Sequence, residues 1–315
     1  MTEPPQPPQP LQPLDRPRRL GPGDRVAVVA TSGTLVPERL DRGVATLRSW
    51  GLDVVVGRHA LERRRHLAGS DEQRAADLQQ AWCDPATRAV VCARGGSGAA
   101  RIVDLLDWDA MRAAGPRVLV GFSDVTVLHQ AVANRLGLVT LAGPMAATEA
   151  FAGSAPDDES VQHLRSTLFD PGSVRVLAGG GLQREVGGRA RGVLVGGTLA
   201  LLANTVGTPE HRPARGGLAV LEDVAEPAYR IDSMLTQLLR TGWFDGVAGI
   251  VLGSWRDCGP AAHETLVERL APLGVPLVSG LPFGHALPQR TVPLGVEADL
   301  DADAGSLTLV QPALQ

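Results

Sequence analysis

A serine lies at a turn of the kind where hydrolases place their nucleophiles. In the segment 118–126 (VLVGFSDVT), branched apolar residues end at Gly121 and a helical pattern begins at Val125. A strand-to-helix turn exposes the hydroxyl of Ser123, and the helix N-terminus offers N–H donors to an oxyanion. Serine is also a common helix cap, and Val125 stands where the G-x-S-x-G elbow has its second glycine. The turn by itself therefore leaves nucleophile and cap open.

A nucleophilic serine needs a base, and the base needs an orienting partner. Among the seven histidines, His285 is distinguished by its loop, residues 281–290 (LPFGHALPQR), whose glycine and prolines restrict the backbone. Glu222 and Asp223 follow the predicted strand 218–221, so either carboxylate is a candidate partner for the histidine. Acidic residues at such strand ends also cap loops or are simply solvated.

A glycine-rich turn at residues 94–98 (RGGSG) follows one predicted strand and precedes a predicted helix. Its glycines allow backbone N–H groups to approach a ligand or an oxyanion closely. The turn is a poor dinucleotide fingerprint, because the first strand ends in Thr31-Ser-Gly33 where G-x-G-x-x-G belongs. Tight packing of the turn is the simpler alternative.

The composition excludes several chemistries. Every basic residue other than histidine is an arginine, and the absence of lysine excludes a Ser-Lys dyad, a lysine Schiff base and a Walker-type P-loop. The net charge of -4 is mild and the charges are interspersed, so we expect neither a nucleic-acid nor a membrane partner.

The cysteines and the first residues indicate a compartment. Cys83, Cys92 and Cys258 lie far apart without C-x-x-C spacing, which argues against disulfides and a zinc ribbon. Residues 1–15 lack the apolar core of a secretory signal, and no apolar run is long enough to cross a bilayer. We therefore predict a cytoplasmic protein, with no metal and no cofactor.

Strands and helices are predicted to alternate in the first half of the chain. The predicted strands there are 25–30, 52–56, 89–92, 117–121 and 137–141; the predicted helices are 37–50, 70–83, 98–107 and 125–136. Such alternation favours an α/β fold with a doubly wound, mostly parallel sheet. Ligands of these sheets bind beyond the carboxyl ends of the strands, which is where the glycine-rich turn and Ser123 fall.

The domain organisation is predicted from changes in amino-acid composition along the chain. Residues 1–16 are predicted to be a disordered Pro/Gln-rich tail, and residues 17–150 an amino-terminal α/β domain that carries the nucleophile. Residues 151–185 are predicted to be a connection. Residues 186–315 are predicted to be a smaller carboxy-terminal α/β domain that carries the glutamate and the histidine.

Several separated stretches together resemble the LD-carboxypeptidase family of serine peptidases (S66 type), which includes muropeptide LD-carboxypeptidases and microcin C immunity peptidases. The stretches are 67–74 (LAGSDEQR), 94–98 (RGGSG), 120–126 (VGFSDVT), 196–202 (GGTLALL), 221–232 (LEDVAEPAYRID), Gly284-His285 and 292–295 (VPLG). Each stretch is weak evidence by itself. They occur in the family's order and at similar spacing from about residue 20 to 312, which makes the set specific.

The resemblance implies roles for individual residues. It makes Ser123 the nucleophile, His285 the base and Glu222, rather than Asp223, the orienting acid. It also implies an oxyanion hole made of the backbone N–H groups of Asp124 and of one residue of the glycine-rich turn, Gly96. The active site is expected between two domains, usually in a homodimer.

The expected activity is hydrolysis of the LD amide bond of cytoplasmic muropeptides, which shortens a tetrapeptide to a tripeptide and releases D-alanine. The free carboxylate of the substrate needs a cation, for which Arg230 is our candidate, with an ion pair to a nearby acid as its alternative role. Ser97 stands where family members commonly have tyrosine, so side-chain recognition is expected to differ.

Two other functions remain open at this point. One is an immunity-type peptidase that cleaves peptidyl or aminoacyl nucleotides, for which Trp255 is the aromatic residue to examine. The other is a non-catalytic α/β ligand-binding protein in which Ser123 is only a cap.

Overall fold

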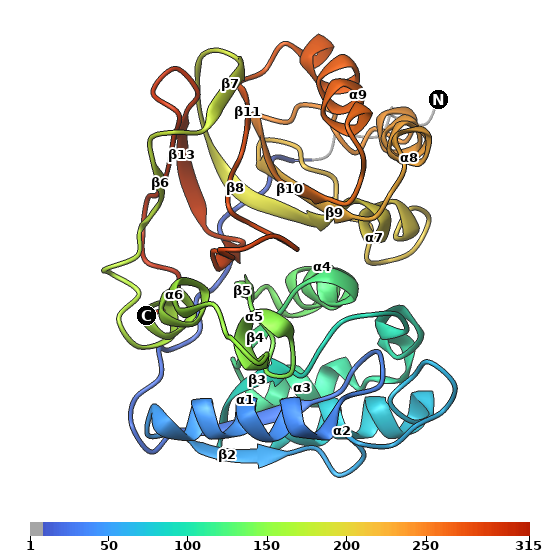
Figure 1. Ribbon diagram of the computed structural model, residues 1–315, viewed down its shortest axis with the longest axis vertical. Coiled ribbons are helices and arrows are strands. Elements are labelled where there is room, and N and C mark those ends of the chain that lie inside the picture. Colours follow the sequence, from blue (N-terminus) through green and yellow to red (C-terminus); the bar gives the residue numbers. More distant parts are fainter. Residues whose placement is uncertain (1–8) are drawn as a thin grey trace, which may run out of the picture.

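Two β-sheets form the framework of the protein. The computed structural model describes residues 9–315, and within them a six-stranded sheet has the order β12-β5-β4-β3-β1-β2. An eight-stranded sheet has the order β6-β14-β13-β8-β9-β10-β11-β7. The two sheets and their helices lie one above the other in Figure 1, with the amino-terminal body below.

The amino-terminal sheet is built from short apolar strands. Its parallel strands are β1 (Arg25–Val29), β2 (Asp53–Val56), β3 (Thr87–Cys92), β4 (Val118–Gly121) and β5 (Thr140–Ala142). Successive side chains point to opposite faces, so Val28 belongs to one apolar core and Val29 to the other. The central strands β1, β3 and β4 are buried on both faces, which explains why they read as continuous apolar runs, whereas the edge strand β2 is largely exposed.

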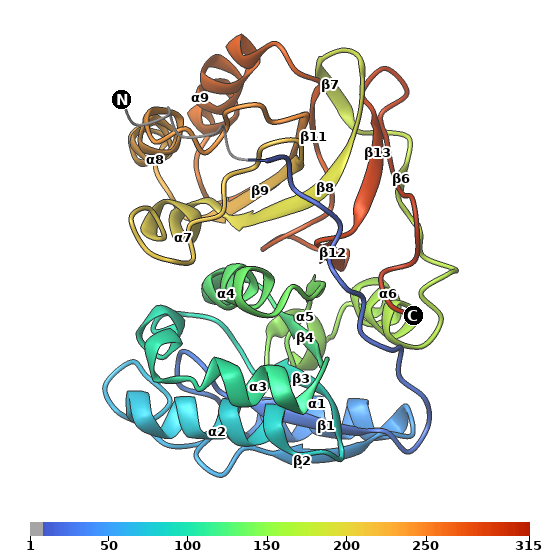
Figure 2. The ribbon, with the colours of Figure 1, turned by 180° about the vertical axis from the view of Figure 1, so that it is seen from behind.

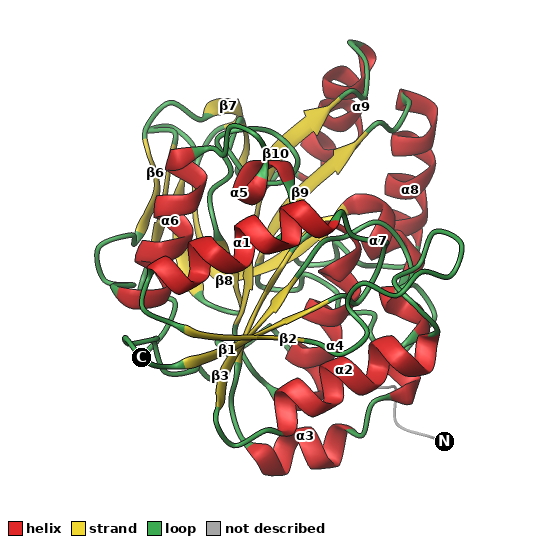
Figure 3. Ribbon diagram, turned by 60° about the horizontal axis from the view of Figure 1, so that its bottom comes forward, coloured by secondary structure: helices red, strands yellow, loops and turns green. Residues whose placement is uncertain are grey.

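Helices cover both faces of this sheet (Figure 3). One face carries α1 (Pro37–Ser49), α5 (Glu149–Ala152) and α6 (Asp158–Phe169). The other carries α2 (Asp71–Cys83), α3 (Trp108–Ala114) and α4 (Thr126–Leu136). The predicted doubly wound, mostly parallel arrangement is therefore confirmed.

The predicted helix 98–107 is wrong. Residues 99–105 form two single 3-10 turns, η1 (Ala99–Arg101) and η2 (Val103–Leu105), and a helix begins only at α3. The reason is the side chain of Asp107, which accepts a hydrogen bond from the backbone N–H of Ala110. This N-cap starts a new helix where the pattern suggested the end of one.

The carboxy-terminal sheet is mixed. Its parallel centre consists of β8 (Arg189–Thr198), β9 (Leu218–Val224), β10 (Gly249–Arg256) and β11 (Leu277–Ser279). Antiparallel strands flank it: β6 (Val176–Gly179), β7 (Gln183–Val186), β13 (Glu297–Asp301) and β14 (Ser306–Leu309). Three helices pack on it: α7 (Leu199–Asn204), α8 (Ala228–Arg240) and α9 (Ala261–Leu270). The 3-10 turn η4 (Ala271–Leu273) directly follows α9.

The two bodies exchange segments. Residues 151–185, expected as a connection, contain α6, which packs on the amino-terminal sheet, and two strands of the other sheet. Strand β12 (Val292–Leu294) leaves the carboxy-terminal body and pairs antiparallel with β5. The loop between β11 and β12, which carries His285, therefore crosses from one body to the other.

The predicted tail is only partly within the described residues. Residues 1–8 lie outside them, whereas residues 9–16, predicted to be disordered, run along the carboxy-terminal body (Figure 2). Leu11 N–H donates to the Arg215 carbonyl, and Leu14 N–H donates to the Gly295 carbonyl. Both leucine side chains pack on apolar cores, and this burial fixes the segment.

Candidate active site

Ser123 occupies a strained turn after β4. Its φ angle is +62°, in the left-handed region that non-glycine residues rarely adopt. The hydroxyl caps neither the following turn, η3 (Ser123–Val125), nor α4. It lies instead 3.2 Å from Nε2 of His285. The cap alternative therefore does not describe this serine, and backbone strain of this kind is typical of functional sites.

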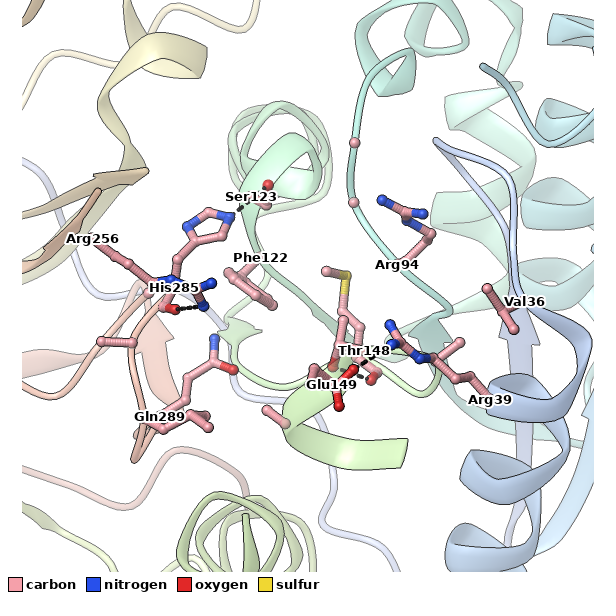
Figure 4. A pocket seen from close by; sticks show the side chains of 18 residues that line it. Val36, Arg39, Arg94, Phe122, Ser123, Thr148, Glu149, Arg256, His285 and Gln289 are labelled. Atoms are coloured by element: carbon pink, nitrogen blue, oxygen red, sulfur yellow. Dashed lines mark hydrogen bonds and ion pairs between the residues drawn. The ribbon is translucent and has the colours of Figure 1, made fainter. Parts of the chain in front are cut away.

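His285 connects the serine to a buried carboxylate. Its Nδ1 lies 2.7 Å from Oε2 of Glu222, whose side chain is 1% exposed. The other carboxylate oxygen of Glu222 accepts a hydrogen bond from the Thr198 hydroxyl. The imidazole also packs edge-on against Phe122, with ring centroids 4.9 Å apart. Ser123, His285 and Glu222 thus form one hydrogen-bonded chain, whose serine–histidine link is drawn in Figure 4.

Asp223, the alternative acid, faces the other side of β9. Its Oδ2 accepts from the N–H of Ala200 at 2.9 Å, and its Oδ1 accepts from the N–H of Val224 at 2.8 Å. Burial raises the pKa of Asp223 to about 6. Neighbouring strand residues point in opposite directions, so only one of the two acids meets the histidine. That residue is Glu222.

The glycine-rich turn packs directly on Ser123. A Cβ atom on Gly95 would stand 2.9 Å from Cβ and 3.0 Å from Oγ of the serine, and Gly96 has a φ angle of +117°. Among the described residues, the N–H groups of Gly96 and Asp124 donate to no protein atom. Both are therefore available to an oxyanion beside the serine. Sequence reasoning did not distinguish Gly95, the glycine in closest contact with Ser123.

A cavity of about 280 Å³ opens in front of the serine and the histidine (Figure 4). Apolar side chains line part of it: Val36, Phe122, Met145, Ala147, Ala150 and Leu287. Charged side chains line another part: Arg39, Arg94, Glu149 and Arg256. The cavity lies between the two bodies and combines a short apolar wall with an excess of positive charge.

The three arginines of the cavity differ in their partners. Arg39 pairs with Glu149. Arg256 pairs with Asp257 at 3.2 Å and donates to the carbonyl of His285. Arg94 donates to the Thr34 carbonyl at 3.0 Å and, among the described residues, forms no ion pair. Arg94 is therefore the cavity arginine best able to bind an incoming anion.

Arg230 and Trp255 do not line the cavity. Arg230 is exposed on α8, and its Nε donates to Glu226 at 2.6 Å. This i,i+4 pair lies outside the cavity, so the carboxylate-binding role that we predicted for Arg230 does not fit its position. Trp255 packs against the apolar core of the carboxy-terminal body. The signal for Arg94 was present in the sequence, since this residue begins the glycine-rich turn.

Residues 9–315 contain no cluster of three or more histidine, cysteine, aspartate or glutamate side chains that could hold a metal ion. No helix in that range is both long and apolar enough to cross a membrane.

Comparisons with known proteins place this geometry in context. Residues 26–143 match the family model described as the LD-carboxypeptidase N-terminal domain, and residues 191–300 match the LD-carboxypeptidase C-terminal domain. A putative carboxypeptidase of Streptomyces coelicolor is 60% identical over 96% of this chain and 98% of its own length. The murein tetrapeptide carboxypeptidase of Pseudomonas aeruginosa is 37% identical over 89% of this chain and 94% of its own length.

A solved structure shows the same fold. MccF in complex with glutamyl sulfamoyl guanosine superposes with a TM-score of 0.86 at 22% identity, covering 95% of this chain and 99% of the other.

Proposed function

The chain belongs to the LD-carboxypeptidase family of S66 peptidases, and on that premise we propose that it is a serine hydrolase that releases a carboxy-terminal D-amino acid from a peptide. The observation that carries this proposal is the hydrogen-bonded chain from Ser123 through His285 to Glu222 at the wall of the cavity. A ligand-binding protein would have no need of a strained serine aligned with a histidine and a buried acid.

The first half of the reaction forms an acyl-enzyme. Nε2 of His285 accepts the proton of the Ser123 hydroxyl as Oγ attacks the carbonyl carbon of the scissile amide. Glu222 holds the ring so that Nδ1 carries its proton and the imidazolium is stabilised. The N–H groups of Asp124 and Gly96 bind the oxyanion, and the helix N-terminus favours the same charge.

Collapse of the tetrahedral intermediate breaks the carbon–nitrogen bond. His285 gives its proton to the leaving amine, and the D-amino acid departs. Water then enters, His285 accepts one of its protons, and the resulting hydroxide attacks the ester carbonyl. The second intermediate expels Ser123 Oγ, which recovers its proton from His285, and the shortened peptide is released.

The proposed substrate is a muropeptide tetrapeptide, which loses D-alanine to become a tripeptide. A relative at 37% identity is named a murein tetrapeptide carboxypeptidase, which supports this substrate class. The exposed guanidinium of Arg94, which forms no ion pair within residues 9–315, is suited to the free carboxylate of the terminal residue. Arg94 directly precedes Gly95, whose backbone packs on Ser123, and this proximity along the chain supports the assignment.

We do not propose nucleotide-linked substrates. Among the described residues that line the cavity, Phe122 is the only phenylalanine, tyrosine or tryptophan, and its ring packs against His285. A nucleobase would need a free aromatic face on which to stack.

The test is hydrolysis by the purified protein. We expect a disaccharide tetrapeptide to yield D-alanine and a tripeptide, identified by mass spectrometry, and a peptidyl-adenylate mimic to remain intact. Ser123→Ala should abolish release while the protein still melts cooperatively near the wild-type temperature. Undiminished hydrolysis by this variant would exclude Ser123 as the nucleophile.

A further inference from the structure

A buried arginine lies beneath the glycine-rich turn. Arg74 belongs to α2, and its side chain is 0% exposed. Its Nη1 donates to the carbonyl of Gly98 at 2.8 Å and also to the carbonyl of Thr31, while its Nη2 pairs with Asp71. One guanidinium therefore joins the helix to two loops at the carboxyl edge of the amino-terminal sheet.

The contact with Gly98 leaves no free space. A Cβ atom at Gly98 would stand 3.0 Å from Nη1 of Arg74 and 2.6 Å from Cδ2 of Leu67, and the φ angle of this glycine is +115°. The end of the glycine-rich turn therefore rests directly on the guanidinium.

A second buried side chain, that of Asp124, binds the residue that follows the glycine-rich turn. The N–H of Ala99 donates to Oδ2 of Asp124 at 2.8 Å, and Asp124 is 3% exposed. Asp124 also contributes its own N–H to the proposed oxyanion hole. At the other end, the carbonyl of Gly95 accepts from the N–H of Gly33 at 3.1 Å. The position of the turn relative to Ser123 thus depends on three contacts outside the turn itself.

Burial of the charged Arg74 side chain is energetically unfavourable for holding a loop in place. Burying a charged group costs free energy that its ion pair and hydrogen bonds often do not recover, and apolar residues commonly pack as stably. Within the described residues, Nε of Arg74 is also buried without a hydrogen-bond partner. Such a costly arrangement is better explained by the geometry that it imposes than by stability alone.

We propose that Arg74 is a positioning residue for the oxyanion hole, an inference that rests on the proposed function. By fixing the carbonyls of Gly98 and Thr31, it keeps the N–H of Gly96 directed at the oxygen that becomes negative when Ser123 attacks. Its effect belongs to the transition state, because the ground-state carbonyl carries less charge.

The variants are Arg74→Met, Arg74→Lys and a matched control, Arg101→Gln. Arg101 also pairs with Asp71, but its side chain is 55% exposed and, among the described residues, donates to Asp71 and not to the glycine-rich turn. Its backbone N–H donates to the Gly98 carbonyl, and the substitution keeps this hydrogen bond. Each protein is assayed for D-alanine release from the tetrapeptide. Each is also labelled at Ser123 with a small fluorophosphonate, which measures reactivity at the serine independently of the peptide.

For Arg74→Met we expect kcat and the labelling rate to fall by about a hundredfold while KM stays near the wild-type value. Arg74→Lys keeps the positive charge and an ammonium donor but loses the planar guanidinium. Its kcat and its labelling rate should therefore lie between those of the wild type and those of Arg74→Met. Arg101→Gln should match the wild type.

Three outcomes would overturn the proposal: unchanged rates in Arg74→Met, a rise in KM without a fall in kcat, or loss of folding in Arg74→Lys. The last would reveal a purely structural residue. If the wild-type protein is labelled but releases no D-alanine, the proposed substrate is wrong, and the labelling rates still decide the role of Arg74. If it shows neither reaction, both proposals fail.

Discussion

The backbone of Gly284 lies directly against the carboxylate of Glu222. A Cβ atom at Gly284 would stand 2.2 Å from Oε2, the same oxygen that lies 2.7 Å from Nδ1 of His285. The glycine also has a φ angle of +96°. The residue before the histidine must therefore be a glycine both to make the turn and to leave room for the acid.

Gly284→Ala should lower kcat by at least about a hundredfold, because the added methyl group displaces the carboxylate that orients His285. The matched control is Gly280→Ala, in the same loop. Gly280 has a similar φ angle of +90°, but no atom lies within 4 Å of its hypothetical Cβ. Both variants carry the same backbone strain, so comparable kcat values in the two would disprove the steric explanation.

Glu222→Gln should reduce kcat by about three to four orders of magnitude, since the neutral amide neither stabilises the imidazolium nor enforces the correct tautomer. Its neighbour provides the control. Asp223→Asn should retain kcat, because Asp223 accepts hydrogen bonds from Ala200 and Val224 and does not contact His285. Steady-state assays of both variants decide between the two acids. A larger loss of kcat in Asp223→Asn than in Glu222→Gln would make Asp223 the partner of His285.

Ser123→Gly should be more stable than Ser123→Ala by about 1 kcal/mol, because glycine accepts the φ angle of +62° without strain. Both variants should be inactive. Denaturant unfolding measures the difference. Equal free energies of unfolding would mean that the turn relaxes when the serine is removed.

Arg94→Gln should raise KM for a peptide with a free terminal carboxylate, through loss of about 1.5–3 kcal/mol of a charge-assisted hydrogen bond. A peptide with a carboxy-terminal amide serves as the matched substrate. The wild-type enzyme should discriminate strongly against the amide, and the variant should not. If the discrimination persists in Arg94→Gln, the carboxylate is bound by another residue.

A fall in pH should weaken the contact between α6 and the loop that carries His285. Nδ1 of His163 accepts a hydrogen bond from the N–H of Thr291 at 3.1 Å, and burial, with a contribution from Arg290, lowers the pKa of His163 from 6.5 to about 4. The unfolded chain binds this proton near pH 6.5 and the native protein only near pH 4. The stabilisation is thus complete above pH 6.5 and is lost as the pH falls towards 4.

The size of this effect is on the order of 3 kcal/mol between the two ends of that range. His163→Asn keeps an acceptor for Thr291 without titrating, so its free energy of unfolding should fall less between pH 6.5 and 4 than that of the wild type. His66→Asn changes an exposed histidine and should leave the wild-type slope unchanged. Parallel slopes for wild type and His163→Asn would show that another group causes the loss.

Much of the fold was predictable because its signals are local. The buried strands around Val28, Val90 and Leu119 are short apolar runs, and a capping box marks the start of the helix that follows Ser70. The error at residues 98–107 has a local cause as well, because Asp107 caps the helix that begins at Trp108 and does not end one. The crossing of β12 to the amino-terminal sheet has no local signal, because strand pairing is a contact between distant residues.

Residue types and local pattern indicate which groups could react: a serine at a strand-to-helix turn, one histidine in a restricted loop, two adjacent acids, a glycine-rich turn and no lysine. The folded chain sets how these groups are used. It turned Glu222 rather than Asp223 towards His285, forced Ser123 into a left-handed turn, and brought Arg94 to the cavity while leaving Arg230 outside. Residue types and local periodicity specify chemistry and elements, but the direction and partner of a side chain depend on packing between segments far apart in the chain.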